Sequence, residues 1–198
     1  MPLFDLPPSA RESSEVKFSA TLKGEKRRHL PLYLSSLVTR AEMAQLIANI
    51  LRIGDIEFPG GIADDFTDVS KEHWAYNAIM HAKAQKIVCG NGDGTFLPDN
   101  PVTYAEAIKM IVITLGYNPL SEARGAWPAG YLTVANSLGL LSIAIVDEYA
   151  TREDVAIILE RALDIPLMVQ TGFGSQVEYN ILNGENGTVL KTLESEFK

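Results

Sequence analysis

A four-residue phrase occurs three times in this chain and constrains its fold more than any other feature. The copies are Thr39-Arg40-Ala41-Glu42, Thr103-Tyr104-Ala105-Glu106 and Thr151-Arg152-Glu153-Asp154. Apolar residues then follow at the same offsets from each Thr, with the spacing of one helical face. One supersecondary unit repeated three times predicts a fold that stacks such units, so function is expected between repeats.

The first and last positions of the phrase have a local structural explanation. Thr followed three residues later by Glu or Asp is a capping box, in which the hydroxyl and the carboxylate each satisfy a helix-start amide. Capping does not explain Arg40 and Arg152, because a cation faces the positive end of the helix dipole there. An Arg beside free helix-start amides suits an anionic ligand, and a solvated surface Arg is the alternative.

Composition excludes several function classes. The 198 residues have a net charge of −8, which argues against nucleic acid as the main partner. No apolar run is long enough for a membrane helix, so membrane insertion is not expected. Cys89 is the only cysteine, which excludes an intramolecular disulfide, and its apolar neighbours predict a core position. No cofactor site and no metal site is predicted.

The chain divides into three parts. Residues 1–37 are proline-containing, lack a sustained period and are predicted to be disordered or loosely attached. Residues 38–165 hold the repeats: a half motif at 38–54, a full motif at 66–117 and a shortened motif at 127–164. Residues 166–198 predict short strands over 167–171, 177–182 and 188–193, typical of a β-rich tail that starts a truncated domain.

Helices are predicted over about 40–53, 74–86 and 104–115, with Gly54 and Gly116 as their end signals. The last of these is apolar nearly all round and should be the most buried. A stretch led by Trp127 aligns with one led by Trp74, so each complete repeat pairs a Trp-led helix with a Thr-capped helix. The glycine-rich segment 90–99 between them fails the calcium-loop pattern and predicts a tight turn.

The phrases of the second repeat together resemble the surface-layer homology (SLH) motif. The resemblance rests on Phe66-Thr67-Asp68-Val69, Trp74-Ala75, the turn Gly90 to Pro98, and Val102-Thr103-x-Ala105-Glu106. It covers about residues 38–165. It implies a mainly α fold in which a pseudo-threefold trimer of motifs places the three Thr-capped helices in a central bundle. A short β fragment would follow at the C-terminus.

The resemblance also implies a function: non-covalent anchoring of bacterial, Gram-positive surface proteins to an anionic secondary cell-wall polysaccharide, often pyruvylated. The ligand would lie in grooves between motifs, with the capped-helix Arg as the main contact. The residues of this chain that match groove positions are Arg40, Arg152, Trp74, Trp127, Tyr104, Glu42 and Asp68. The two Trp residues can equally be packing residues, and Glu42 and Asp68 can be cap residues. Because Tyr104 replaces an Arg, one groove is expected to bind carboxylate weakly.

Two other functions were weighed. A hydrolase needs two carboxylates facing across a cleft, and Asp64-Asp65 have no identified partner, so the chain is not predicted to be an enzyme. A protein–protein scaffold built on degenerate repeats remains open. The family implies a cell-surface location, whereas the chain as given has no export signal, which we attribute to a truncated gene model.

Overall fold

The computed structural model describes residues 34–54, 56–59, 66–141, 149–170, 178–181 and 191–196. The described part is mainly helical, with a small antiparallel sheet. Its helices are α1 (Arg40–Ile50), α2 (Tyr76–Ala84), α3 (Tyr104–Thr114), α4 (Asn118–Ala123), α5 (Ala129–Ser137), α6 (Arg152–Leu163) and α7 (Leu193–Glu196). Its strands are β1 (Met168–Gln170) and β2 (Tyr179–Ile181). The predicted loose segment falls almost entirely outside the described residues, as do residues 188–190 of the strand predicted over 188–193.

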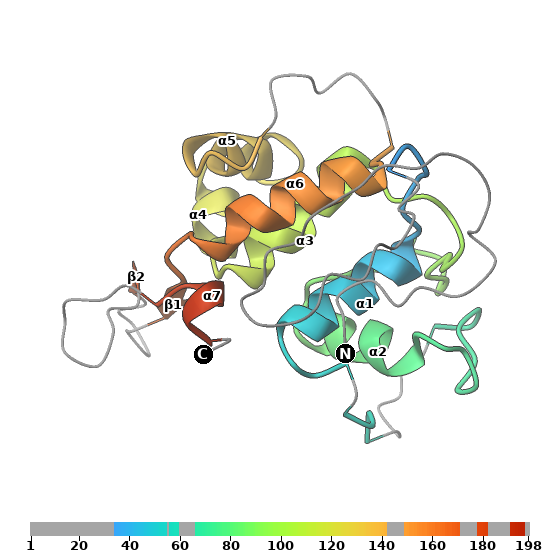
Figure 1. The fold of residues 1–198 in the computed structure, drawn as a ribbon. Helices are drawn as coiled ribbons and strands as arrows, with labels where there is room; N and C mark the ends of the chain where they lie inside the picture. The colour runs from blue at the N-terminus through green and yellow to red at the C-terminus, as the bar shows by residue number, and fades with distance from the viewer. Residues whose placement is uncertain are drawn as a thin grey trace, which may run out of the picture.

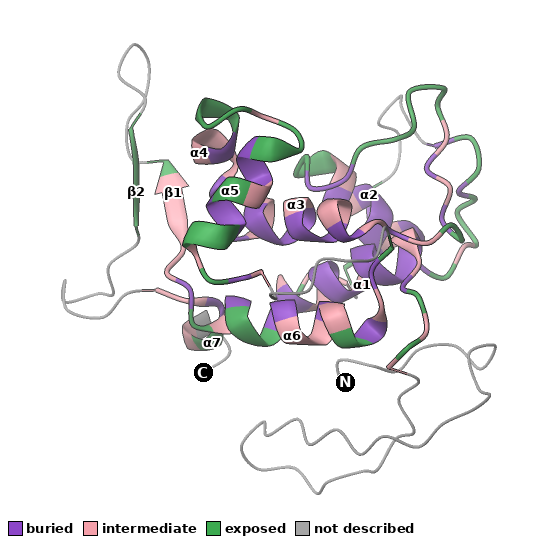
Figure 2. Cartoon of the chain, turned by 90° about the horizontal axis from the view of Figure 1, so that it is seen from above, coloured by how far each residue is buried: buried purple, intermediate pink, exposed green. Residues whose placement is uncertain are grey.

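Each of the first two capped helices packs against the Trp-led helix that follows it. Helix α2 lies on α1, α5 lies on α3 with α4 beside it, and α6 runs along α3 (Figure 1). Seen from above, α3 lies between α5 and α6 (Figure 2). No helix in the described ranges is long and apolar enough to cross a membrane.

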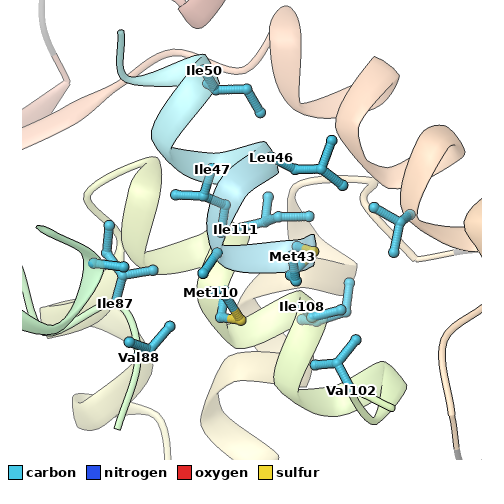
Figure 3. Packing of buried hydrophobic residues seen from close by; sticks show 14 of the residues in the cluster. Met43, Leu46, Ile47, Ile50, Ile87, Val88, Val102, Ile108, Met110 and Ile111 are labelled. Atoms are coloured by element: carbon cyan, nitrogen blue, oxygen red, sulfur yellow. The ribbon is translucent and has the colours of Figure 1, made fainter. Parts of the chain in front are cut away.

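The repeated apolar spacing forms the core, as predicted. In α1, Met43 and Ile47 are almost fully buried, and they lie near Ile108 and Ile111 of α3 (Figure 3). In α6 the same face buries Ile158. The removal of this apolar surface from water is the main stabilising term for the helix assembly. The offsets read from the sequence therefore located the interior correctly.

The sequence predicted that α3, the second Thr-capped helix, would be the most buried helix, and this prediction was wrong. Helix α1 buries eight of its eleven residues, against six of eleven for α3. The reason lies in small residues. Ala41, Ala44 and Ala48 are all buried on α1 and allow neighbouring elements to approach closely on more than one side. The apolar composition of a helix does not by itself show how closely neighbouring elements pack against it.

A closed ring of backbone hydrogen bonds joins the three segments that precede the capped helices. The ring uses the residue just before each capping Thr: Val102 N–H donates to Val38 O, Ala150 N–H to Val102 O, and Val38 N–H to Ala150 O, at 2.8, 2.9 and 3.0 Å. Isolated bridges pair Thr39 with Pro101, Thr103 with Tyr149 and Thr151 with Leu37. Three segments far apart in sequence are thus fixed side by side, and the three helix starts with them.

The ends of the helices follow one pattern, with one correction. Gly116 ends α3 with φ of +88°, as its position predicted. Helix α1, in contrast, ends at Ile50, and Arg52, with φ of +57°, takes the left-handed position predicted for Gly54; the Ile53 amide then donates to Ala48 O. A non-glycine residue in this left-handed conformation is the reason that the glycine signal misplaced the end by two residues.

Helix α4 was not predicted, because residues 117–126 read as a linker. The segment is short and has Pro119 in its first turn, where proline is tolerated because that amide has no helical partner. Gly130 of α5 lies so close to it that an added Cβ would meet the carbonyl oxygen of Ser121 at 2.0 Å. This close contact fixes α5 against α4.

The described part of the tail is attached to the helical body. Strands β1 and β2 pair antiparallel within the predicted strand ranges, with Met168 opposite Ile181. The Met168 amide donates to Leu115 O, and Leu193 is buried in the core. Leu193 begins helix α7, so the predicted strand reaching residue 193 was wrong there. Reciprocal Thr192–Ser195 hydrogen bonds close a helical turn instead.

Candidate functional site

All three Thr-capped helices have a complete capping box, as the sequence predicted. In α1 the Thr39 hydroxyl accepts from the Glu42 amide at 3.1 Å, and the Glu42 carboxylate accepts from the Thr39 amide at 3.0 Å. Helices α3 and α6 repeat this arrangement, with Asp154 serving in α6. Each box occupies only one carboxylate oxygen. The other oxygen is thus available for a contact between repeats.

The helix-start amides are not free, which corrects one premise of the anion prediction. The Arg40 and Ala41 amides donate to Asn100 O and Pro98 O, each at 2.9 Å. The Arg152 amide donates in the same way to Ser36 O, also at 2.9 Å. At the starts of α1 and α6, a segment distant in the sequence supplies these carbonyls. Any anion at these positions must therefore be held by the guanidinium and not by the backbone.

Arg40 joins the first repeat to the second. Its Nε donates to Phe96 O at 2.8 Å, its Nη2 donates to Cys89 O at 3.0 Å, and its Nη1 pairs with Glu106 Oε1 at 2.6 Å. Its guanidinium carbon also lies 4.8 Å from the centroid of the Phe96 ring. Of about five N–H donors on a guanidinium, three are thus committed to the protein.

Arg152 makes the corresponding contact between the third repeat and the first, with fewer partners. Its Nη2 donates to Glu42 Oε1 at 2.6 Å, in a pair whose side chains are only 9% and 10% exposed. Its Nε is buried and has no hydrogen-bond partner among the residues that the structure describes. A buried N–H without an acceptor costs about 1–3 kcal/mol. The Arg152 guanidinium is therefore less fully hydrogen-bonded within the described residues than that of Arg40.

The junction between the second and third repeats has no Arg. Tyr104 stands at the position of Arg40 and is buried, 4% exposed. Asp154 uses its Oδ2 for the capping box. Of the two ion pairs found within the described residues, neither lies at this junction. The three junctions thus differ in how much positive charge they offer.

Asp68 fixes the glycine-rich turn. Its carboxylate accepts from the amides of Phe96 and Leu97, at 2.8 and 2.7 Å. These bonds hold the turn whose carbonyls receive Arg40. Within the turn, the Asp93 carboxylate accepts from Thr95, which lowers the pKa of Asp93. Asp68 therefore orders the first junction indirectly.

The two predicted groove aromatics are both exposed, Trp74 by 47% and Trp127 by 44%. Trp74 stacks on His73, with ring centroids 5.6 Å apart. Trp127 contacts Tyr131 edge-on at 6.2 Å and has the ammonium of Lys109 5.1 Å from its ring centroid. Their exposure leaves indole surface free for contact with a ligand, while packing accounts for only part of each ring.

Sequence reasoning missed three contributors to these surfaces. Phe96 is buried beneath Arg40 and was read only as part of a turn. Cys89 was predicted in the core but is exposed, and its carbonyl accepts from Arg40. Lys109 was not singled out in the sequence. No local signal distinguishes these roles, since each depends on a partner many residues away. No group of three or more metal-ligating side chains occurs within the described ranges.

Residues 65–108 match the S-layer homology domain. The chain is 35% identical over 145 residues to the middle cell wall protein of Brevibacillus brevis, covering 73% of this chain and 14% of that protein. It is 33% identical over 150 residues to a surface layer protein of Brevibacillus choshinensis, covering 73% and 13%. A cellulosome-anchoring protein of Acetivibrio thermocellus is 36% identical over 69 residues, covering 35% and 15%. The chain therefore spans only a small part of these relatives.

Proposed function

This chain carries an S-layer homology domain, and we propose that it anchors a bacterial surface protein non-covalently to the secondary polysaccharide of the cell wall. The observation that carries the proposal is the guanidinium of Arg152, which commits one N–H to Glu42 and keeps a buried Nε without a partner among the described residues. The relatives named for cell walls, surface layers and cellulosome anchoring support the wall as the binding partner.

We further propose that the repeats are related by a pseudo-threefold axis, with the capped helices α1, α3 and α6 as the central bundle. The closed ring formed by Val38, Val102 and Ala150 supports this arrangement, because each segment donates to one neighbour and accepts from the other. Ligand sites then lie at the junctions between repeats. The site at Arg152 is the strongest of them, because Arg40 is largely committed and Tyr104 carries no charge.

The expected ligand is an anionic sugar polymer whose charge is a carboxylate, as in a pyruvate ketal. A guanidinium binds a carboxylate through two parallel N–H donors, a geometry that an ammonium cannot reproduce. The body of the protein is acidic overall, so attraction must come from such local cations and not from its net charge of −8. Anchoring of this kind needs neither catalysis nor a cofactor.

The test compares the full chain with its Arg152→Lys variant in binding to purified wall polysaccharide that carries pyruvate ketals. The substitution keeps the positive charge opposite Glu42 but removes the planar fork, so we expect binding about 10-fold weaker. Arg124→Ala is the control, since Arg124 is exposed and is not among the ion-pairing residues of the junctions. It removes a surface charge and should leave affinity within about 2-fold.

Circular dichroism establishes that each variant remains folded before binding is compared. A folded Arg152→Lys protein with unchanged affinity would contradict the Arg152 site. Absence of binding by the unmodified chain to the polysaccharide would contradict the anchoring function itself. Binding to a wall protein in that second case would favour the scaffold alternative.

A further inference from the structure

Within the part of the chain that the structure describes, Lys109 forms no ion pair, although the protein is acidic. It comes from the middle of α3, six residues after the capping Thr103, and its side chain is partly buried. The chain has 25 Asp and Glu against 17 Lys and Arg, yet no ion pair to Lys109 occurs among the described residues. Its ammonium instead lies 5.1 Å from the Trp127 ring centroid and 5.4 Å from that of Tyr131.

The surroundings hold this cation against two aromatic rings, without an ion pair to it among the described residues. Tyr131 is 2% exposed, and its hydroxyl is 2.5 Å from Asn118 Oδ1 and from Glu122 Oε1. Burial, with Glu122 beside it, raises the pKa of Tyr131, so the phenol stays neutral. Glu122 is therefore already engaged by Tyr131.

The corresponding surface of the preceding repeat lacks these features. Gln45 stands six residues after Thr39, where Lys109 stands after Thr103, and its amide donates to Asn49 within α1. Among the described residues no cation lies over the Trp74 ring, which stacks on His73. The two exposed indoles therefore face different electrostatic surroundings, although their exposure is nearly equal.

We propose that Lys109 and Trp127 form a second subsite that binds a carboxylate-bearing sugar residue, with Lys109 as its charge-reading residue. Sugar C–H groups pack on the exposed indole surface, and the ammonium pairs with the carboxylate. An ammonium already desolvated on one side by two rings pairs more strongly with an anion than a fully hydrated one. The proposal rests on the proposed anchoring function, because it places a second contact for the same polymer on α3 and the segment just before α5.

Two forms of the polymer test the roles of Lys109 and Trp127 separately. One is wall polysaccharide that carries pyruvate ketals, and the other is the same polymer after mild acid has removed them. Lys109→Met should weaken binding to the first form about 5-fold and leave binding to the second unchanged. Trp127→Ala should weaken binding to both forms about 5- to 10-fold, because it removes the stacking surface. Lys109→Arg, which keeps the cation, should stay within about 2-fold of the unmodified chain.

Lys83 offers the matched control. Its ammonium lies 4.1 Å from the centroid of the Phe66 ring, but Phe66 is only 6% exposed and presents no surface to a ligand. Lys83→Met therefore removes the same charge and the same kind of contact, and should leave affinity within about 2-fold. Urea unfolding of both Met variants shows whether either change acts through stability.

The outcomes distinguish this subsite from the anchoring function. If Arg152→Lys weakens binding and Lys109→Met does not, the subsite is wrong and the anchoring function stands. An equal loss for Lys109→Met on both polymer forms would also overturn its role in reading charge. If the unmodified chain binds neither form, both proposals fail together.

Discussion

Arg40 and Arg152 occupy the same position of the same repeated phrase, but their surroundings differ. The Arg40 side chain is 16% exposed, its partner Glu106 is 33% exposed, and two backbone carbonyls share the guanidinium. The Arg152 side chain is 9% exposed, and its only partner among the described residues is Glu42, 10% exposed. Both ion pairs span 2.6 Å. The two ion pairs therefore have equal lengths, but removing the Arg should lower the free energy of unfolding by different amounts. The reason is that a buried charge left without its partner is more destabilising than a partly exposed one.

The first prediction breaks each pair in turn and has the largest expected effect. Arg152→Met should lower the free energy of unfolding by about 3–5 kcal/mol, because it leaves the Glu42 carboxylate buried and unpaired. Arg40→Met should lower it by only about 1–2 kcal/mol, because Glu106 remains partly solvated. Urea unfolding followed by circular dichroism at 222 nm measures both values.

The double variant Arg152→Met with Glu42→Gln provides the control for that comparison. Gln preserves the capping box and removes the unpaired charge, so part of the lost stability should return. Equal losses for the two Arg variants would show that burial does not distinguish the junctions.

The second prediction concerns Asp68, which supports the Arg40 junction alone. Asp68→Ala removes two charge-assisted hydrogen bonds to the amides of Phe96 and Leu97, and should lower the free energy of unfolding by about 2 kcal/mol. Thr67→Ala is the neighbouring control, with an expected change below about 0.5 kcal/mol, since Thr67 is exposed and its hydroxyl contact to Gly94 O is long at 3.4 Å. Indistinguishable effects of the two substitutions would remove Asp68 from the junction.

The third and smallest expected effect is a difference in salt dependence. The coupling energy of each Arg–Glu pair can be measured by a double-mutant cycle at about 0.05 M and about 1 M NaCl. The Arg40–Glu106 coupling should fall by about 0.5 kcal/mol at high salt, because mobile ions screen partly exposed charges. The Arg152–Glu42 coupling should change less. A larger salt effect on the buried pair would reverse the assignment of the two environments.

The parts of the fold that follow from local sequence were predicted well. The capping Thr residues, the apolar face that includes Met43 and Ile158, and the end signal at Gly116 all depend on contacts within about four residues along the chain. The predictions were wrong at three places. Arg52 takes the left-handed position after α1 in place of a glycine, α4 forms within an expected linker, and Cys89 is exposed, with its carbonyl accepting from Arg40, 49 residues away.

The candidate site shows the same division. The sequence marked Arg40 and Arg152 as cations that no local rule explained, and both do lie at junctions between repeats. It did not show that their acidic partners would be Glu106 and Glu42, 66 and 110 residues away. The sequence also did not predict that the helix-start amides would donate hydrogen bonds to carbonyls of another segment.

The sequence by itself determined three capped helices, their buried faces and the residues with chemistry at their starts. These properties depend on the near neighbours of each residue along one helix. The tertiary structure alone decided which guanidinium would be committed, which would keep a buried N–H, and that Lys109 of α3 would lie over Trp127. Those outcomes depend on how separate helices are placed against one another, and the ring through Val38, Val102 and Ala150 fixes that placement for the capped helices.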